Sequence, residues 1–157
     1  MTFSHLNTEG KATMVDVSEK QVSLRTATAR SVVVLPAEVL VQLTDADFQT
    51  KKGSVFQTAI IAGIMAAKKT GDLIPLCHPL GLDNCGINIQ LNEKQEVVID
   101  CSATITAKTG VEMEALVGAS IAALTIYDMC KALSHNIVIK ETKLMSKTGG
   151  KRDFKRA

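Results

Sequence analysis

Two segments of the sequence have the length of helices but almost no polar face. The first runs from Ala59 to Ala67, and the second runs from Ala115 to about Leu133. A helix that is apolar on nearly every side has to be buried on all of them. A chain of 157 residues fits one compact domain, but it has difficulty burying such a helix alone. The sequence therefore predicts a single domain over 1–157 that makes contacts with other subunits.

Sequence signals mark where the helices begin. Ser54 and Gln57 fit the capping box S/T-x-x-E/Q before the first apolar run, and Thr109 and Glu112 fit it before the second. Pro36 is expected to open a shorter helix, because proline suits the first helical turn.

Strand patterns lie before, between and after the two long helices. Apolar and polar side chains alternate through much of 22–35 and through 87–91 and 99–105, which is the period of strands with one covered face. A final strand is expected over about 136–145. With the short helix left aside, the order β-α-β-β-α-β predicts an α+β, ferredoxin-like fold. Its antiparallel sheet would carry two long helices on one face.

The two ends of the chain differ from this regular centre. Residues 1–20 are polar and mixed, and we expect a flexible arm that becomes ordered on contact with substrate or a neighbouring subunit. The tail, 148–157, is basic and contains glycine. We find no apolar stretch of the roughly 18 residues needed to span a membrane and no signal-peptide core. We therefore expect a cytoplasmic protein with no membrane partner.

Composition argues against several other classes of protein. The net charge is only +2 and aromatic residues make up 3% of the chain, whereas an RNA-binding module of this topology needs exposed aromatic side chains on its central strands. We therefore expect no nucleic-acid partner. The cysteines form no C-x-x-C pair and no recognised zinc spacing, which predicts reduced thiols and no metal site. They are Cys77, Cys85, Cys101 and Cys130.

A charged pair in the second apolar helix is the most informative feature for function. Asp128 and Lys131 are three residues apart and so share one helical face. A charged pair in a buried helix is poor evidence of added stability. Two interpretations stay open: a structural ion pair, or an acid/base pair whose pKa values are shifted by apolar surroundings.

A loop and the start of the second helix provide further candidates. Pro75 and Pro79 bracket Cys77 and His78 and should present both side chains in a fixed direction, although His78 could equally be a satisfied core residue. Glu112 could serve only to cap the helix, whereas a free helix start can also bind an anion or a polar ring. Glu114, next along, has no capping role and is the better candidate.

Phosphate binding would have to rely on scattered cations. The chain has no P-loop motif, so lysines and helix N-termini would hold the phosphates. Gly149 and Gly150 would let the backbone approach a ligand closely. The candidate cations are Lys51, Lys52, Lys131, Lys147, Lys151 and Arg152.

Taken together, these motifs resemble the cyclic pyranopterin monophosphate synthases. The resemblance covers nearly the whole chain and rests on 14–18, 52–53, 72–80, 108–116, 123–132 and 147–151. It implies a ferredoxin-like subunit in a homohexamer, a trimer of dimers with active sites at subunit interfaces. It also implies a lyase of molybdenum cofactor biosynthesis that converts 3′,8-cyclo-7,8-dihydro-GTP to cyclic pyranopterin monophosphate with release of pyrophosphate.

The resemblance also implies roles for individual residues. Lys52 and Lys131 would be the general acid/base residues, and Asp128 would orient one of them. A lysine crowded by cations would have a lowered pKa, which the Asp128 carboxylate would oppose. No cofactor is expected, apart from Mg²⁺ as an optional companion of the triphosphate. The residues expected to bind substrate are Leu76, Cys77, His78, Glu112, Met113, Glu114 and Lys147.

A second function remains open on the sequence alone. The same scaffold hosts many unrelated activities, so the chain could be a non-catalytic oligomer that binds a nucleotide. That alternative predicts binding without turnover and leaves Asp128 and Lys131 as a plain ion pair.

Overall fold

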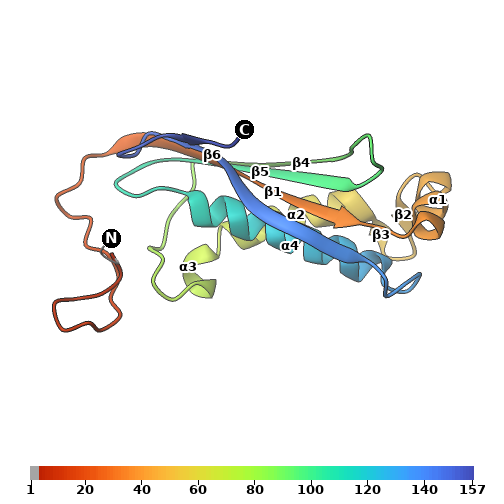
Figure 1. Cartoon of the computed structure of the whole chain (residues 1–157), viewed down its shortest axis with the longest axis horizontal. Coiled ribbons are helices and arrows are strands. Elements are labelled where there is room, and N and C mark those ends of the chain that lie inside the picture. Colours follow the sequence, from red (N-terminus) through yellow and green to blue (C-terminus); the bar gives the residue numbers. More distant parts are fainter. Residues whose placement is uncertain (1–3) are drawn as a thin grey trace.

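A five-stranded antiparallel sheet with two long helices against one face forms the framework of the molecule (Figure 1). The computed structural model describes residues 4–157. The helices are α1 (Ala37–Asp45), α2 (Val55–Ala67), α3 (Thr70–Leu73) and α4 (Glu112–Cys130). The strands are β1 (Ser23–Val34), β2 (Gln49–Thr50), β3 (Gly53–Ser54), β4 (Asn84–Leu91), β5 (Val97–Ala107), β6 (Val138–Thr148) and β7 (Phe154–Lys155).

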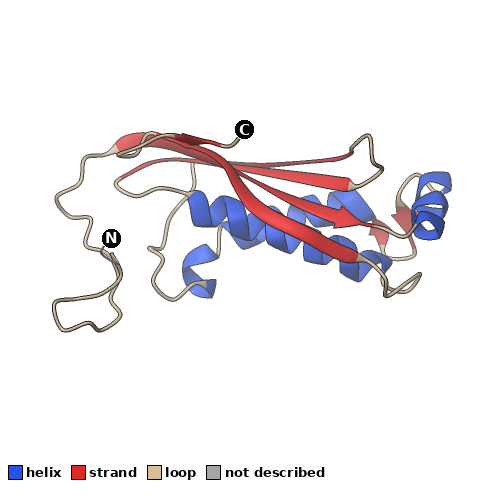
Figure 2. Ribbon diagram, in the orientation of Figure 1, coloured by secondary structure: helices blue, strands red, loops and turns tan. Residues whose placement is uncertain are grey.

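The long strands lie in the order β4-β5-β1-β6, and the short β7 extends the sheet beyond β6. Every neighbouring pair is antiparallel, and Ala29 at the centre of β1 pairs with Cys101 of β5 and Leu144 of β6. Helices α2 and α4 lie side by side under this sheet (Figure 2). The predicted α+β class, antiparallel sheet and paired long helices are confirmed.

The core lies between the sheet and the two helices, and small residues bring these layers close together. Ala27 and Ala29 of β1 and Ala119 of α4 are buried here. Helices α2 and α4 meet at Gly63 and Gly118, where a Cβ on Gly63 would lie 2.7 Å from the Gly118 carbonyl oxygen. The glycines therefore set the helix separation, and α4 can run the length of the sheet.

The helix starts follow the sequence signals only in part. Ser54 caps α2 as predicted, and its Oγ accepts a 3.4 Å hydrogen bond from the Gln57 amide. The predicted capping box at Thr109 is wrong: Val111 occupies the N-cap of α4, and no side chain in the described part of the chain caps it. The Glu112 carboxylate instead accepts a hydrogen bond from Lys147 of β6.

Several boundaries also differ from the predicted ones. Helix α2 begins at Val55, ahead of the apolar run that starts at Ala59, and ends with that run at Ala67. The separate α3 follows, with Thr70 Oγ1 donating to the Ala67 carbonyl. Strand β6 continues to Thr148, and β7 pairs back onto it. Part of the basic tail therefore belongs to the sheet. The small β2–β3 hairpin has no counterpart in the predicted order.

Helix α4 is long and apolar enough to cross a membrane by length and composition alone, so the expectation that no segment reaches this length is wrong. Half of the residues in its apolar window are buried inside the fold, against the sheet and α2. Its composition is explained by this position, because the core helix of a globular domain meets the same criterion.

Candidate functional site

The residues predicted to carry chemistry form a cluster at the C-terminal end of α4. We call Lys52, Asp128 and Lys131 the lysine–aspartate cluster. Lys131 Nζ lies 2.8 Å from Asp128 Oδ1, and Lys52 Nζ lies 3.0 Å from Asp128 Oδ2. Lys52 Nζ also donates to the Asp128 carbonyl oxygen at 3.2 Å. One carboxylate thus holds two ammonium groups side by side.

The β2–β3 hairpin brings Lys52 to this cluster. Gly53, at φ +109°, takes a backbone conformation that other residues rarely adopt. Thr50 Oγ1 accepts a hydrogen bond from the Lys52 amide at 3.1 Å. The Lys52–Gly53 dipeptide is therefore a turn that directs the lysine side chain toward the end of α4.

Charge attraction, and not apolar surroundings, shifts the pKa values in this cluster. Hydrogen bonds from Lys131 and Lys52 lower the pKa of Asp128, and the hydrogen bond to Asp128 raises the pKa of Lys131. The Asp128 side chain is 51% exposed, so the expected desolvation of this pair is wrong. Nearby cations were expected to lower the pKa of Lys131, and the Asp128 carboxylate was expected to raise it. The effect of the carboxylate is the larger one, so the Lys131 side chain is held as an ammonium ion.

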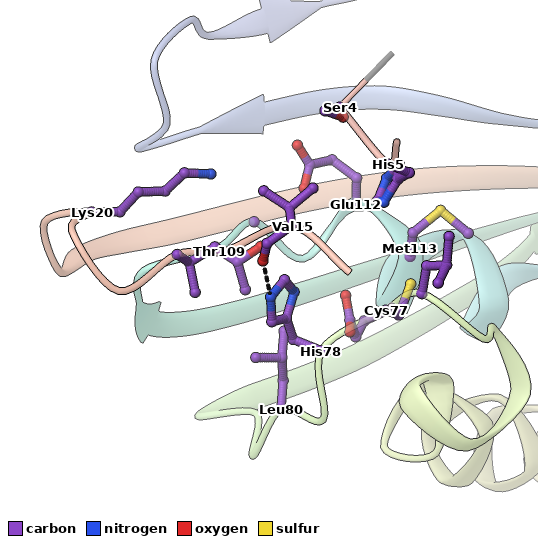
Figure 3. Close-up of a pocket in the computed structure, with 14 residues that line it drawn as sticks. Ser4, His5, Val15, Lys20, Cys77, His78, Leu80, Thr109, Glu112 and Met113 are labelled. Atoms are coloured by element: carbon purple, nitrogen blue, oxygen red, sulfur yellow. Dashed lines mark hydrogen bonds between the residues drawn. The ribbon is translucent and has the colours of Figure 1, made fainter. Parts of the chain in front are cut away.

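A second group of predicted residues surrounds a cleft at the other end of α4 (Figure 3). We call it the arm cleft, because the N-terminal arm provides one wall through Ser4, His5, Val15 and Val17. Its volume is about 250 Å³. The predicted residues Leu76, Cys77, His78, Glu112, Met113 and Glu114 form the rest of its lining with Leu80, Lys20, Thr109 and Gly110.

The loop before β4 presents the Cys77 and His78 side chains to this cleft. The Cys77 amide donates to the Ile74 carbonyl at 3.1 Å, closing a tight turn. His78 Nε2 lies 2.8 Å from the Val15 carbonyl oxygen of the arm. A carbonyl only accepts hydrogen bonds, so Nε2 carries the proton. His78 is therefore a half-buried cleft residue and not a member of the closed core.

Burial raises the pKa values of one carboxyl group and one thiol group in the arm cleft. Glu114 is only 3% exposed, and burial, with the nearby Glu112 carboxylate, raises its pKa. Burial, followed by repulsion from Glu114, raises the pKa of Cys77. Cys77 is therefore suited to lining the cleft as a neutral thiol, not to nucleophilic attack.

The cleft continues into a pocket rich in cations, of about 380 Å³, which we call the cation pocket. Lys20, Arg25, Lys147 and Lys151 line it, and it shares Glu112 with the arm cleft. Lys147 Nζ lies 2.9 Å from Glu112 Oε1. Burial raises the pKa of Glu112, but the hydrogen bond from Lys147 and the Arg25 charge outweigh it, and the pKa is lowered.

Arg25 and Lys20 are pocket residues that sequence reasoning missed. Side chains alternate along β1, so Arg25 lies on the same face of the strand as the buried Ala27 and Ala29. A charged residue among these small apolar residues could have indicated a pocket residue from the sequence. It donates from Nε to the Ala107 carbonyl at 3.0 Å. Lys20 had no such signal, because it belongs to the arm, which has no regular period.

The glycine pair at 149–150 also has a role in the packing of the strands. Gly149, at φ +84°, lies so close to Leu24 that a Cβ would collide with the Leu24 carbonyl oxygen. Gly150 similarly lies near Arg25 Nη1. Gly149 therefore allows the chain after β6 to lie close against the start of β1, and Gly150 lines the cation pocket.

The lysine–aspartate cluster and the arm cleft do not meet within one chain. Glu112 and Asp128 are sixteen positions apart on one continuous helix, which corresponds to about 24 Å at 1.5 Å per residue. Figure 1 shows α4 along one face of the sheet, with its two ends at opposite ends of the molecule. Within residues 4–157, no three His, Cys, Asp or Glu side chains form a group that could hold a metal ion.

Comparisons with known proteins give a consistent result. Residues 14–150 match the sequence profile of the MoaC family. A protein of Xanthomonas campestris pv. campestris named cyclic pyranopterin monophosphate synthase is 54% identical over 152 residues, covering 97% of this chain and 92% of its own length.

Two longer relatives match this chain through part of their length. Molybdenum cofactor biosynthesis protein 1 of Dictyostelium discoideum is 49% identical, over 95% of this chain and 26% of its own. The molybdenum cofactor biosynthesis bifunctional protein of Synechocystis sp. is 50% identical, over 96% of this chain and 45% of its own.

Proposed function

The chain belongs to the MoaC family, and we propose that it converts 3′,8-cyclo-7,8-dihydro-GTP to cyclic pyranopterin monophosphate and pyrophosphate. Its relatives carry the names of a cyclic pyranopterin monophosphate synthase and of molybdenum cofactor biosynthesis proteins. The protein is therefore a biosynthetic enzyme of the molybdenum cofactor. We expect it to act in the cytoplasm and to need no redox cofactor, with Mg²⁺ only as a companion of the triphosphate.

The joined cleft and pocket support this substrate. The arm cleft offers apolar walls from Leu76, Leu80 and Met113 with polar groups between them, which suits a flat heterocycle. The cation pocket next to it has Arg25, Lys20 and Lys151 in addition to the Lys147–Glu112 pair, which suits a triphosphate. One ligand with a ring at one end and phosphates at the other would occupy both.

The proposed reaction rearranges rings and forms a cyclic phosphate. A ribose-derived hydroxyl oxygen attacks the α-phosphorus, the bond from that phosphorus to the bridging oxygen of pyrophosphate breaks, and the hydroxyl proton passes to a base. Groups that move protons are therefore needed. Lys52 and Lys131 are the proposed acid/base residues, and Asp128 positions both. The raised pKa of Lys131 favours the acid role or charge neutralisation for that residue in the free protein.

The proposed architecture of the active site rests on one observation: the arm cleft and the lysine–aspartate cluster lie at opposite ends of α4. A substrate held in the arm cleft of one subunit would lie out of reach of the same subunit's Asp128. We propose that a second copy provides the lysine–aspartate cluster, in the hexamer, a trimer of dimers, that the family resemblance implies. A two-fold interface would make two such composite sites per dimer.

The order of the long strands also agrees with a ferredoxin-like subunit, which we propose as the scaffold. The split βαβ plan places the first strand at the centre beside the third. Here β1 lies beside β5, and the two long connections run through α2 and α4.

An anaerobic turnover assay tests the proposed activity. The purified protein is incubated with 3′,8-cyclo-7,8-dihydro-GTP while pyrophosphate and the pterin product are followed. We expect turnover by the native chain and its loss in Lys52→Ala and Lys131→Ala. Turnover by a well-folded Lys131→Ala protein at the native rate would refute the proposed role of that lysine. Tight binding by the native protein without pyrophosphate release would instead support the non-catalytic alternative.

A further inference from the structure

Two consecutive residues between α1 and the β2–β3 hairpin have left-handed backbone conformations. Asp47 has φ +50° and Phe48 has φ +53°. Aspartate tolerates this conformation because its short polar side chain can form local hydrogen bonds, whereas phenylalanine adopts it only at a cost in conformational energy. Such a conformation persists where the surrounding structure enforces it, and it is found most often near functional sites.

The contacts of Phe48 join the two helices that flank the hairpin. Its amide donates to the Leu43 carbonyl of α1 at 2.6 Å, and its carbonyl accepts a hydrogen bond from the Val55 amide of α2 at 2.9 Å. Its ring stacks on the ring of Phe56 in α2, with centroids 4.4 Å apart and planes 26° apart. Both rings pack against the buried core that includes Leu43 and Val55. Phe48 therefore closes the base of the hairpin and attaches it to the framework.

Lys52, in the turn of this hairpin, depends on that attachment for its position. Strands β2 and β3 have two residues each, and a two-stranded ribbon is marginally stable at best in water. The Lys52 side chain is itself half exposed, yet its Nζ lies 3.0 Å from Asp128 Oδ2 on α4. Figure 1 shows α1 and the hairpin at the same end of the molecule as the C-terminal end of α4. The contacts at the base of the hairpin therefore have to place the lysine.

We propose that Phe48 is a positioning residue, which through its stack on Phe56 holds the Lys52 ammonium group against the Asp128 carboxylate. The inference rests on the proposed role of Lys52 in the reaction. It adds a residue that lines neither the arm cleft nor the cation pocket. Misplacement of a reacting group by about 1 Å can lower a rate by roughly 10²-fold. The strained backbone at Phe48 thus fixes the lysine before the substrate binds.

Competitive acetylation of the full-length protein, measured for each lysine by mass spectrometry, tests the position of Lys52 without any turnover. A lysine in an ion pair reacts more slowly than a free one. Phe48→Leu keeps an apolar side chain but loses the flat ring. In this variant Lys52 should react up to about fivefold faster, the factor that corresponds to loss of one exposed ion pair. Phe56→Leu removes the same stack from the side of α2 and should have the same effect.

The acetylation experiment has controls within the chain and in a conservative variant. Lys51 is exposed in the same turn, and Lys94 is exposed in the β4–β5 turn. Both should react at their native rates in every variant. Phe48→Tyr keeps an aromatic ring for the stack, so the reactivity of Lys52 should return to that of the native chain.

Steady-state kinetics distinguish positioning from a general loss of stability. Phe48→Leu should lower kcat by roughly 10–10²-fold and change KM little, because Phe48 lines neither part of the proposed substrate site. Phe48→Tyr should keep the native kcat. Ile99→Val is the matched control, because it removes a methyl group from the buried core. It should lower Tm without changing kcat.

The two measurements separate failure of this inference from failure of the proposed function. Native acetylation of Lys52 in a folded Phe48→Leu protein would overturn the positioning role, whatever the rate of turnover. Faster acetylation together with a native kcat would support the positioning role and contradict the proposed catalytic role of Lys52. If the native chain formed no product, the proposed function would fail, and the acetylation rates would still decide what Phe48 does.

Discussion

Asp128 holds two ammonium groups, and its replacement should reveal both its catalytic role and its effect on Lys131. We expect Asp128→Asn to lower kcat by roughly 10²–10⁴-fold, the usual contribution of general acid/base catalysis. The carboxylate raises the pKa of Lys131, so its loss should lower that pKa. The alkaline limb of the kcat/KM profile should therefore move to lower pH. Rates of pyrophosphate release from about pH 7 to 12 measure both effects, because the ordinary pKa of a lysine is about 10.4.

The matched control for this change is Asp45→Asn at the exposed end of α1. It removes the same charge without touching either lysine and should keep the native rate and profile. An Asp128→Asn protein with an unshifted alkaline limb would show that the limb belongs to a group other than Lys131.

Glu114 and Glu112 should have opposite effects on stability, although they are two residues apart. Burial raises the pKa of Glu114 above its ordinary 4.5, so its ionised form destabilises the folded state at neutral pH. Its contribution to stability is fully present below about pH 4.5 and is lost as the pH rises. Glu114→Gln should therefore raise Tm at pH 7 and increase the free energy of unfolding by on the order of 1 kcal/mol. This gain in stability should vanish in acid.

Glu112→Gln is the matched comparison, because the pKa of Glu112 is lowered. Its contribution is present above its unfolded pKa and is lost as the pH falls, so the substitution should lower Tm at pH 7. Thermal unfolding followed by circular dichroism at pH 7 and pH 4 distinguishes the two. Equal effects of both substitutions would contradict the assigned burial and pairing.

At this scale the sequence indicated candidate site residues more readily than it indicated their surroundings. Polar or reactive side chains within apolar segments can be recognised from neighbouring residues in the sequence alone. Asp128, Lys131 and the Cys77–His78 pair are of this kind. Asp128 is half exposed because of where α4 ends relative to the sheet. A local sequence pattern does not predict that position. Lys20 was missed because its position follows from hydrogen bonds made by other arm residues.

At the scale of elements, the contact of α4 with β5 and α2 depends on Gly118. Alanine is ordinarily favoured over glycine in a helix by about 1 kcal/mol. A Cβ on Gly118 would lie 2.5 Å from the buried Cys101 Sγ, and overpacking of this kind costs about 1–3 kcal/mol. We therefore expect Gly118→Ala to lower the free energy of unfolding, measured by denaturant titration.

The sulfur atom itself can be tested in a double-mutant cycle. Cys101→Ala removes the atom that the new methyl group would meet, so the double variant should lose less stability than the sum of the single ones. Gly81→Ala is the control, because no atom of the described residues comes within 4 Å of its Cβ position. Strict additivity would mean that the carbonyl of Gly63, 3.3 Å away, is the real obstacle.

Periodicity predicted the long strands and helices because burial of one face repeats along each element. The start of α4 was harder to predict. Thr109 and Glu112 have the spacing of a capping box, but Glu112 pairs with Lys147, 35 residues away. The capping signal at Ser54 succeeded because no distant partner within residues 4–157 competes for its hydroxyl group. The β2–β3 hairpin was missed because two-residue strands are too short to show a period.

At the scale of the molecule, the two halves of the candidate site are separated by the length of α4. The sequence places Glu112 near one end of that helix and Asp128 near the other, and the structure keeps them apart. Outward-facing apolar residues on α2 and α4, including Ile61, Met65 and Leu124, are half exposed in the single chain. Incomplete burial of these helices and an incomplete site both favour a second subunit.

Mixing two inactive variants tests whether the site is shared between subunits. Lys131→Ala disables the lysine–aspartate cluster, and Lys147→Ala disables the cation pocket. If each site takes its cluster from one chain and its cleft from another, co-expression in equal amounts should restore about a quarter of native activity, because random pairing makes one site in four wholly intact. Lys131→Ala paired with Lys94→Ala should give about half, in any architecture. No recovery in the first mixture, with subunit exchange verified, would mean that each active site is built within one chain.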